Sequence, residues 1–285
     1  MLTVTLETGV RSIMEAPIRV GAVEYLNTKP LIYDLENLAA NIELALEVPS
    51  RLADLLADGR LDVALIPVIE YFRAGTYTIV PDISIASRGP VLSVTLFSRV
   101  PWKGIRRVAL DEGSRTSAAL CQILLRRKYG VAPDVVPLPL DHAAEEADAD
   151  AVLLIGDRAM RACLPGFAHA YDLGQEWHDW TGLPFVYAVW AVRAGVELGP
   201  VEAALSEAKF RGSARIGEIA HQEAPKLGLD AGFCRRYLAN IIHFELGPRE
   251  QAGLHHFYML ACELGLARRG VNLELYRPLH LAESR

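Results

Sequence analysis

The chain has 285 residues, of which 51% are hydrophobic and 22% charged, with a formal net charge of -6, a pI near 5.8 and a mean hydropathy of +0.18. This composition is typical of a folded globular protein and not of a disordered one. The acidic balance argues against nucleic acid as a partner, because binding to a phosphate backbone requires a basic surface.

Targeting and redox signals are weak. The longest apolar runs, such as residues 151–155, are far shorter than the ~20 residues of a membrane-spanning helix, so no membrane partner is expected. Residues 1–16 do not resemble a secretory signal, which predicts a cytoplasmic protein with an N-terminal extension, residues 1–13 being an upstream mis-start or a frayed arm. The four cysteines form no CxxC motif or Cys/His cluster, so buried reduced thiols and no metal site are expected.

The first half of the chain alternates strands and helices, which predicts an α/β fold. Strands are expected at residues 18–23, 42–47 and 61–66, with helices from about residue 30 and at residues 48–56. After the first strand come Asn27, Thr28 and Lys29, at a strand-to-helix junction of the kind where open α/β sheets bind small ligands. The same residues with Pro30 also make an ordinary capped turn, and both readings stay open.

A second lobe is expected from about residue 99. A strand at residues 90–97 and a turn-rich break precede a strand at 107–110 and a helix at 118–129, which repeat the earlier plan. Further strands are expected at 151–155 and 183–190, followed by helices to about Gly265. If residues 94–98 and 185–189 cross between the lobes side by side, residues 17–97 and 188–285 form lobe 1 and residues 98–187 form an inserted lobe 2.

Three polar turns are candidates for ligand binding. Ser114, Arg115, Thr116 and Ser117 lie at a predicted helix N-terminus, where free N–H groups and the helix dipole favour a carboxylate. These hydroxyls exceed what capping alone requires, although Ser114 could cap the helix while Arg115 lies in solvent. Ser93 faces either a cleft or a sheet edge. Gly156 and Asp157 form a ligand contact or only an Asx turn.

Familiar catalytic motifs are absent from the sequence. It has no P-loop, GxGxxG, GxSxG or HExxH, which removes support for NTP hydrolysis, NAD chemistry and serine hydrolysis. Glu24, Glu70 and Asp157 lie near predicted strand ends, but spacing alone does not select a general base among them.

Several short motifs, in order and with matching spacing, resemble the chorismate dehydratase family of the futalosine route to menaquinone. They cover residues 18 to about 192 and are 25–31 (YLNTKPL), 49–53 (PSRLA), 62–67 (DVALIP), 89–93 (GPVLS), 114–117 (SRTS), 155–157 (IGD) and 180–185 (WTGLPF). Each motif is weak alone, and their common order makes the resemblance specific.

The resemblance implies a two-lobed fold like that of type II periplasmic binding proteins, with the ligand cleft between the lobes. It also implies an enzyme that dehydrates chorismate to 3-[(1-carboxyvinyl)oxy]benzoate, with no cofactor. Loss of the ring hydroxyl and a neighbouring ring proton makes the ring aromatic, so the protein mainly has to hold the dicarboxylate and exclude water. The resemblance leaves the proton acceptor open, a carboxylate of the substrate being one alternative. Oligomeric state is not predicted, a homodimer being one alternative.

By motif, Asn27 and Ser93 match the family's substrate contacts and are predicted to be catalytic. Asn27 would orient the departing hydroxyl and Ser93 would bond an oxygen of the ring or enolpyruvyl region. Thr116 and Arg115 would fix a carboxylate within a turn that resembles the family's carboxylate site. The remaining predicted substrate-binding residues are Thr28, Ser114, Ser117, Gly156 and Asp157.

The sequence departs from the family pattern at Glu24, Val68 and Arg88, and Glu24 would repel an anion unless it faces away or pairs with Arg88. Two other functions are considered. The 1,4-dihydroxy-6-naphthoate synthase of the same pathway shares the fold, but its serine-proline-rich opening and catalytic histidine have no clear counterpart here. A non-catalytic binding protein for small carboxylates would normally carry an export signal or be fused to a regulator.

Overall fold

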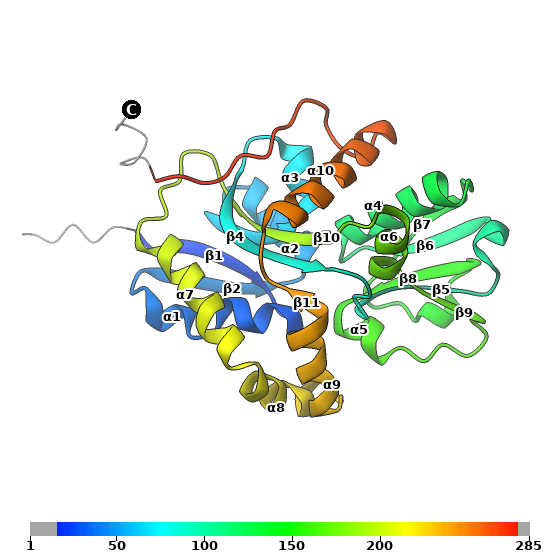
Figure 1. The fold of residues 1–285 in the computed structure, drawn as a ribbon, viewed down its shortest axis with the longest axis horizontal. Helices are drawn as coiled ribbons and strands as arrows, with labels where there is room; N and C mark the ends of the chain where they lie inside the picture. The colour runs from blue at the N-terminus through cyan, green and yellow to red at the C-terminus, as the bar shows by residue number, and fades with distance from the viewer. Residues whose placement is uncertain (1–15, 279–285) are drawn as a thin grey trace, which may run out of the picture.

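The computed structural model describes residues 16–278, which form two α/β lobes joined by two chain crossings (Figure 1). The sheet of lobe 1 has the order β11-β4-β10-β3-β1-β2 and that of lobe 2 the order β7-β6-β8-β5-β9. Lobe 1 contains β1 (Ile18–Val23), β2 (Ile42–Glu47), β3 (Val63–Pro67), β4 (Thr78–Ser87), β10 (Phe185–Val192) and β11 (Ile242–His243). Lobe 2 contains β5 (Val94–Ser98), β6 (Arg107–Asp111), β7 (Asp134–Leu138), β8 (Ala151–Ile155) and β9 (His169–Asp172).

Each sheet has a parallel part that ends at the boundary between the lobes. In lobe 1, β1 pairs in parallel with β2 and β3, and in lobe 2, β6 pairs in parallel with β7 and β8. The strands β1, β2 and β8 have the predicted bounds. Strand β10 is buried along its whole length and pairs antiparallel with β3 and β4.

The predicted pairing of the two crossing strands is wrong. Strand β5 pairs only with β8 and β9, whereas β10 pairs with β3 and β4, so the two strands belong to different sheets. The neighbour of β10 is β4, in which Ser87 lies opposite Phe185. The expected boundaries at residues 97 and 188 therefore fall inside β5 and β10, and the chain crosses between lobes at residues 88–93 and 182–184. In the chain, the strands of the lobe 2 sheet lie between β4 and β10, which are neighbours in the lobe 1 sheet.

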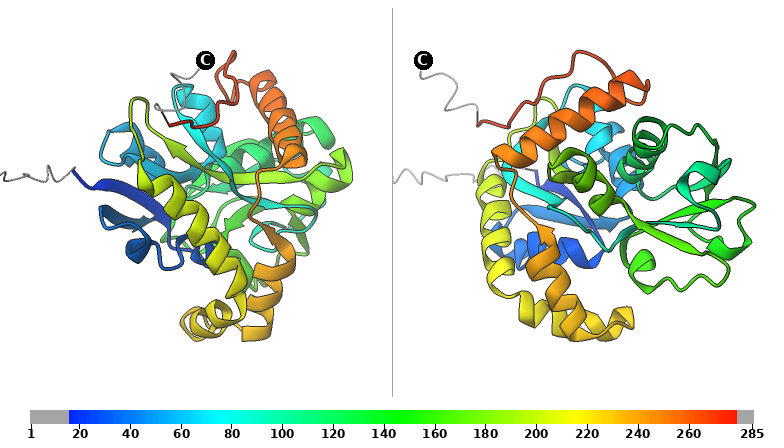
Figure 2. Two further views of the ribbon diagram at one scale, coloured as in Figure 1. Left: turned by 60° about the vertical axis from the view of Figure 1, so that its left-hand side comes forward. Right: turned by 45° about the vertical axis from the view of Figure 1, so that its right-hand side comes forward.

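The helices of lobe 1 begin with η1, a 3-10 helix at Leu26–Ile32, in place of the α-helix expected from residue 30. Pro30 lies inside it and has no N–H to donate to an α-helical ladder. The other helices of this lobe are α1 (Leu35–Leu38), α2 (Pro49–Ala57), α3 (Val68–Ala74), α7 (Pro200–Ala214), α8 (Ile216–Leu227), α9 (Ala231–Arg236), the π-helical turn η5 (Tyr237–Ile241) and α10 (Pro248–Glu263). Helices α7, α8 and α9 follow the outer edge of lobe 1 and lead back to the boundary between the lobes (Figure 2).

Lobe 2 carries η2 (Trp102–Gly104), α4 (Arg115–Ile123), the π-helical turn η3 (Leu124–Lys128), η4 (Ala144–Glu146), α5 (Gly156–Arg161) and α6 (Leu173–Thr181). One hydrophobic core runs through both lobes and includes Leu96 of β5 and Trp190 of β10. A smaller cluster, with Val152 and Leu154, packs on the other face of the lobe 2 sheet.

Two sequence expectations concern the surface and the ends of the chain. All four cysteines are free, and Cys121 and Cys234 are buried as expected. Cys262 is only half-buried, and Cys163 is exposed because it follows the end of α5 in a loop. The expected N-terminal extension lies outside the described residues, apart from Ala16.

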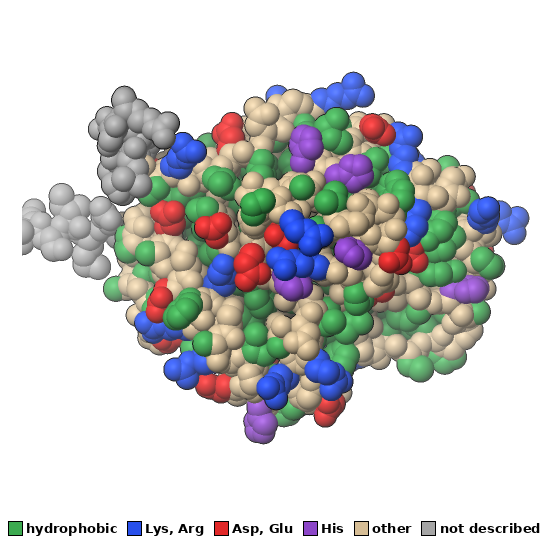
Figure 3. All heavy atoms as spheres, viewed as in Figure 1, with side chains coloured by type: hydrophobic (Ala, Val, Ile, Leu, Met, Phe, Trp, Pro, Cys, Tyr) green, Lys and Arg blue, Asp and Glu red, His purple; other side chains and the backbone are tan. Residues whose placement is uncertain are grey.

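Within residues 16–278, every helix is too short or too polar to cross a bilayer. On the face drawn in Figure 3, basic and acidic side chains are interspersed.

Candidate active site

A narrow cavity of about 50 Å³ lies between the lobes. Lobe 1 contributes the ends of β1 and β3, and lobe 2 contributes the N-terminus of α4 and the end of β8. Its lining residues are Val23, Tyr25, Asn27, Pro49, Pro67, Ile85, Val91, Ser93, Val94, Ser114, Ser117, Ile155, Gly156, Tyr187 and Ala188. Most of this lining is apolar and aromatic, and the polar groups are hydroxyls and one amide.

Asn27 reaches the cavity from η1, directly after the end of β1. Its amide nitrogen donates to the Tyr237 hydroxyl at 3.2 Å, and its amide oxygen accepts from the Thr28 hydroxyl at 3.5 Å. Thr28 is fully buried and is not part of the lining. Thr28 therefore contacts Asn27 and does not face the cavity.

Ser93 lies at the end of the first crossing, one residue before β5. Only 2% of the residue is exposed, although it lines the cavity. Its hydroxyl accepts from Tyr237 at 2.9 Å and donates to the Val91 carbonyl at 3.4 Å. One buried tyrosine hydroxyl thus joins Asn27 and Ser93, which are the two residues predicted to be catalytic.

The crossing that carries Ser93 is fixed by the half-buried carboxylate of Asp172. This carboxylate accepts from the N–H groups of Val91 at 2.9 Å, Leu92 at 2.7 Å and Gln175 at 3.0 Å. These bonds hold Leu92 in the left-handed region, at φ 61°, a strained conformation for a branched side chain. Burial raises the pKa of the Asp172 carboxyl, while the backbone N–H bonds oppose that shift.

The hydroxyls of Ser114 and Ser117 face the cavity together at the N-terminus of α4. Ser114 is the N-cap residue, whose oxygen accepts from the Ser117 N–H, and its hydroxyl donates to that of Ser117 at 2.8 Å. Residues three apart share a helix face, which brings the two hydroxyls side by side. Capping and cavity lining, which are alternatives in the sequence, are combined here, in a place that favours a carboxylate.

Arg115 and Thr116, which are expected to fix a carboxylate, do not line the cavity. Arg115 pairs with Asp54 at 2.9 Å and with Glu70 at 3.5 Å. Thr116 is fully buried, and its hydroxyl accepts from the Ile69 N–H at 3.2 Å. Successive helical residues point about 100° apart, so these two side chains leave the face that Ser114 and Ser117 share. They join α4 to α2 and α3.

Gly156 and Asp157 connect the lobes. Gly156 lines the cavity at φ 58°, and a Cβ atom there would lie 2.8 Å from Cε2 of Tyr25. The buried Asp157 carboxylate accepts from the Leu26 N–H at 3.3 Å and does not line the cavity. Burial raises the pKa of Asp157, against the effect of the Leu26 N–H. Asp157 therefore holds η1 against lobe 2.

The lining residues include no Asp, Glu or His. Asp111, at the end of β6, accepts from the Gly113 N–H at 2.8 Å and lies outside the lining. Glu24 is exposed, and Arg88 pairs with Glu250 at 2.9 Å and not with Glu24. No group of His, Cys, Asp and Glu within residues 16–278 is arranged to hold a metal ion.

Sequence reasoning missed Tyr237, Tyr25 and Tyr187. Tyr25 and Tyr187 line the cavity, and Tyr187 also lies 3.3 Å from the Ser87 hydroxyl. Tyr25 is within a quoted motif and could have been selected as a neighbour of Asn27. No pattern in the sequence indicates Tyr237, because it is far from Asn27 and Ser93 in the chain and belongs to no recognised motif.

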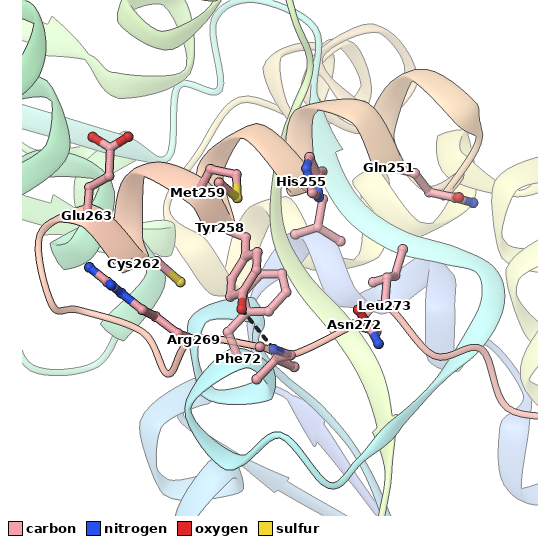
Figure 4. A pocket seen from close by; sticks show the side chains of 13 residues that line it. Phe72, Gln251, His255, Tyr258, Met259, Cys262, Glu263, Arg269, Asn272 and Leu273 are labelled. Carbon is pink, nitrogen blue, oxygen red and sulfur yellow. Dashed lines mark hydrogen bonds between the residues drawn. The ribbon is translucent and has the colours of Figure 1, made fainter.

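A second hollow, of about 500 Å³, lies between α10 and the C-terminal segment (Figure 4). It shares no lining residue with the cavity between the lobes. Its polar groups point in different directions: Glu263 pairs with Arg127, and the Tyr258 hydroxyl accepts from the Val271 N–H. These groups do not converge on a ligand.

Comparisons with known proteins agree on one family. A family described as menaquinone biosynthesis matches residues 18–263. A protein of Thermus thermophilus named chorismate dehydratase is 34% identical over 262 residues, which is 85% of this chain and 94% of that protein. A Campylobacter jejuni protein of the same name is 28% identical over 254 residues, covering 87% and 99% of the two chains.

Solved structures support the fold. A protein from Archaeoglobus fulgidus superposes with a TM-score of 0.71 at 19% identity, covering 88% of this chain and 98% of that one. The periplasmic aliphatic sulphonate binding protein SsuA from Escherichia coli gives a TM-score of 0.65 at 17% identity, covering 93% of each chain. The fold is therefore that of periplasmic binding proteins, as the resemblance implies.

Proposed function

The chain belongs to the menaquinone biosynthesis family, and we propose that it removes water from chorismate to give 3-[(1-carboxyvinyl)oxy]benzoate. The observation that carries the proposal is the Asn27–Tyr237–Ser93 hydrogen-bond chain in a cavity beside the N-terminus of α4. The names of the relatives identify the chemistry, and this geometry brings a few polar groups together in a mostly apolar cavity.

In this proposal the protein contributes binding, orientation and exclusion of water. The apolar lining contacts the ring, and the Ser114 and Ser117 hydroxyls at the start of α4 bind one carboxylate. Asn27 and Ser93 bond the oxygen atoms near the reacting carbon. Donors held in a dry cavity stabilise a departing hydroxide more strongly than the same donors do in water.

The reaction breaks the ring carbon–oxygen bond and one neighbouring carbon–hydrogen bond. The electron pair of the carbon–hydrogen bond completes the aromatic ring, and the released proton and hydroxide together make one water. Because no Asp, Glu or His lines the cavity in the described part of the chain, we assign the proton acceptor to a carboxylate of chorismate itself. Arg115, Thr116, Thr28 and Asp157 then act by holding the lining in place.

The test is turnover of chorismate by the purified protein, followed by loss of chorismate and appearance of the benzoate. We expect Asn27→Ala and Ser93→Ala each to lower kcat/KM by about 100-fold, the usual effect of losing one positioned donor. Asn37→Ala and Ser98→Ala are matched controls, because both side chains lie outside the cavity and bond elsewhere. These controls should stay within a few-fold of the wild type.

Three outcomes would count against the proposal in different ways. Variants that match the controls would reject the roles of Asn27 and Ser93. Binding of chorismate without product would indicate a non-catalytic binding protein. No reaction with chorismate but turnover of a later aromatic acid of the pathway would indicate the naphthoate synthase.

The futalosine route and a cytoplasmic location are part of the same proposal. Four free cysteines, one of them exposed, support a reducing compartment, since oxidising compartments favour disulfides. Fractionation of cells with an antibody to the protein tests the location, and loss of menaquinone on deletion, restored by the benzoate, tests the route. Light scattering of the purified protein tests for a homodimer.

A further inference from the structure

We propose that Tyr237 is a positioning residue that fixes the Ser93 hydroxyl as a hydrogen-bond donor to the substrate. This inference rests on the proposed function and adds a residue to its site. Tyr237 is not among the residues that line the cavity, so it acts through Ser93 and Asn27 and not by touching substrate.

The directions of the hydrogen bonds carry the argument. The amide nitrogen of Asn27 can only donate, so at 3.2 Å the Tyr237 oxygen is its acceptor. The single proton of the Tyr237 hydroxyl then goes to the Ser93 oxygen at 2.9 Å. The chain therefore runs in one direction, from Asn27 through Tyr237 to Ser93.

This order determines what the Ser93 proton can do. One lone pair of the Ser93 oxygen is occupied by Tyr237, so the hydroxyl cannot give its proton to that neighbour. Its remaining protein partner is the Val91 carbonyl at 3.4 Å, well beyond the usual 2.7–2.8 Å of an O–H···O bond. A substrate oxygen in the cavity at normal distance would replace this weak bond.

The surroundings keep Tyr237 protonated and still. Only 1% of the residue is exposed, and burial raises the pKa of its hydroxyl, so it stays a donor throughout the working pH range. Its ring lies parallel to that of Phe233, at 7° between planes and 6.5 Å between centroids. It also begins the π-helical turn η5, a distortion often found at functional sites.

The hydroxyl joins three parts of the molecule. Asn27 belongs to η1 of lobe 1, Ser93 leads into β5 of lobe 2, and Tyr237 comes from the C-terminal helices. The chain of bonds is complete only when all three are in contact. The Ser93 hydroxyl is therefore oriented by Tyr237 only when these three parts are in contact.

The test is Tyr237→Phe, which keeps the ring and removes only the hydroxyl. We expect kcat for chorismate to fall by at least about 10-fold while KM changes by less than about 3-fold, because binding of the carboxylates is untouched. Tyr71→Phe is the matched control: the Tyr71 hydroxyl is also bonded inside lobe 1, to Asn272 and Glu274, but lies outside the cavity. Its kcat should equal that of the wild type.

The decisive measurement is the double variant with Ser93→Ala. If Tyr237 acts through Ser93, Tyr237→Phe causes no further loss of kcat once the Ser93 hydroxyl is gone. Losses that multiply in the double variant would overturn the inference, since a merely structural role does not require Ser93. A single variant with wild-type kcat would also overturn it.

Two further arms keep the outcomes separate. If the wild type does not consume chorismate, the proposed function fails, whereas an active wild type with an unaffected Tyr237→Phe rejects this inference alone.

Should Tyr237→Phe not fold, 3-fluorotyrosine placed at position 237 keeps the hydroxyl and makes it a stronger donor. We then expect kcat to rise with Ser93 present and to be unchanged in Ser93→Ala; an unchanged kcat with Ser93 present overturns the inference.

Discussion

Asp111 is a buried carboxylate whose second oxygen has no hydrogen-bond partner in the described part of the chain. The residue is 2% exposed, and this oxygen lies 3.7 Å from the Arg158 guanidinium. Burial raises the pKa of Asp111 to about 6, against the effects of the Gly113 N–H and Arg158. At neutral pH the folded protein therefore holds an incompletely compensated charge.

We expect the change in unfolding free energy caused by Asp111→Asn to be more favourable at pH 7.5 than at pH 4.5. A carboxyl whose folded-state pKa lies above its unfolded value binds more protons when folded, so stability falls as pH rises from about 4 to 6. Asparagine does not titrate and escapes this loss. The unfolding free energy of the variant minus that of the wild type should therefore rise by about 1 to 3 kcal/mol between pH 4 and pH 6. Urea titrations at both pH values measure it, and a difference that does not change with pH would contradict the assignment.

Residue by residue, the sequence predicted part of the cavity. Asn27, Ser93, Ser114, Ser117 and Gly156 line it, and their roles toward a substrate stay predictions. Motifs could nominate them because each follows or precedes a strand end. Arg115 and Thr116 do not line the cavity, because consecutive residues of a helix point to different faces. Contacts such as that of Tyr237 arise only from tertiary folding.

At the scale of elements, α7 and η1 pack backbone against backbone. A Cβ atom on Gly212 of α7 would lie 2.1 Å from the Pro30 carbonyl oxygen, which is backbone and cannot move aside cheaply. The absence of a side chain lets α7 press on the element that carries Asn27. This packing therefore fixes one wall of the cavity.

We expect Gly212→Ala to lower the unfolding free energy by about 1 to 3 kcal/mol, the usual cost of overpacking, and to lower kcat by shifting η1. Gly217→Ala on α8 is the matched control, because no neighbouring atom lies within 4 Å of the added Cβ. Alanine favours helix by up to about 1 kcal/mol over glycine, so the control should be as stable as the wild type or more so. Equal thermal denaturation of the two variants would show that the contact is unimportant.

Elements with clear periodicity were predictable, and those with a broken pattern were not. Strand β4 was missed because Pro81 and Asp82 interrupt it, and Asp82 has φ 58°. Prolines and positive φ values usually mark turns, so the sequence disguises a strand that pairs with β10 and β11. The strand β5 starts later than predicted because Asp172 holds the residues before it in a crossing.

At the scale of the whole molecule, the two lobes touch where Gly156 meets the ring of Tyr25. The Cβ of any larger residue would approach three ring carbons at 2.8 to 3.0 Å. A substitution here acts on the relation between lobes and leaves each sheet intact. It is therefore a direct test of whether lobe contact is needed for binding.

We expect Gly156→Ala to raise KM for chorismate about 10-fold, equivalent to about 1.4 kcal/mol of lost binding. Gly182→Ala is a matched control, since Gly182 has φ 69° against 58° for Gly156 but no atom within 4 Å of its Cβ. Both variants carry similar backbone strain, so an effect that the two share reports this strain and not the lobe contact. Small-angle scattering with chorismate should show a larger radius of gyration only for Gly156→Ala. A KM shared by the two variants would exclude the lobe contact as the cause.

The pairing of Ser87 with Phe185 has a consequence for how the chain folds. In topological terms, residues 88–184 are the loop of a β-hairpin made by β4 and β10. While that loop is unstructured, joining its ends costs entropy that grows with the logarithm of its length. Once lobe 2 has folded, its two ends are already near each other, and only the two crossing segments remain flexible. The entropy cost of bringing β4 and β10 together is then smaller, so early folding of lobe 2 accelerates completion of the lobe 1 sheet.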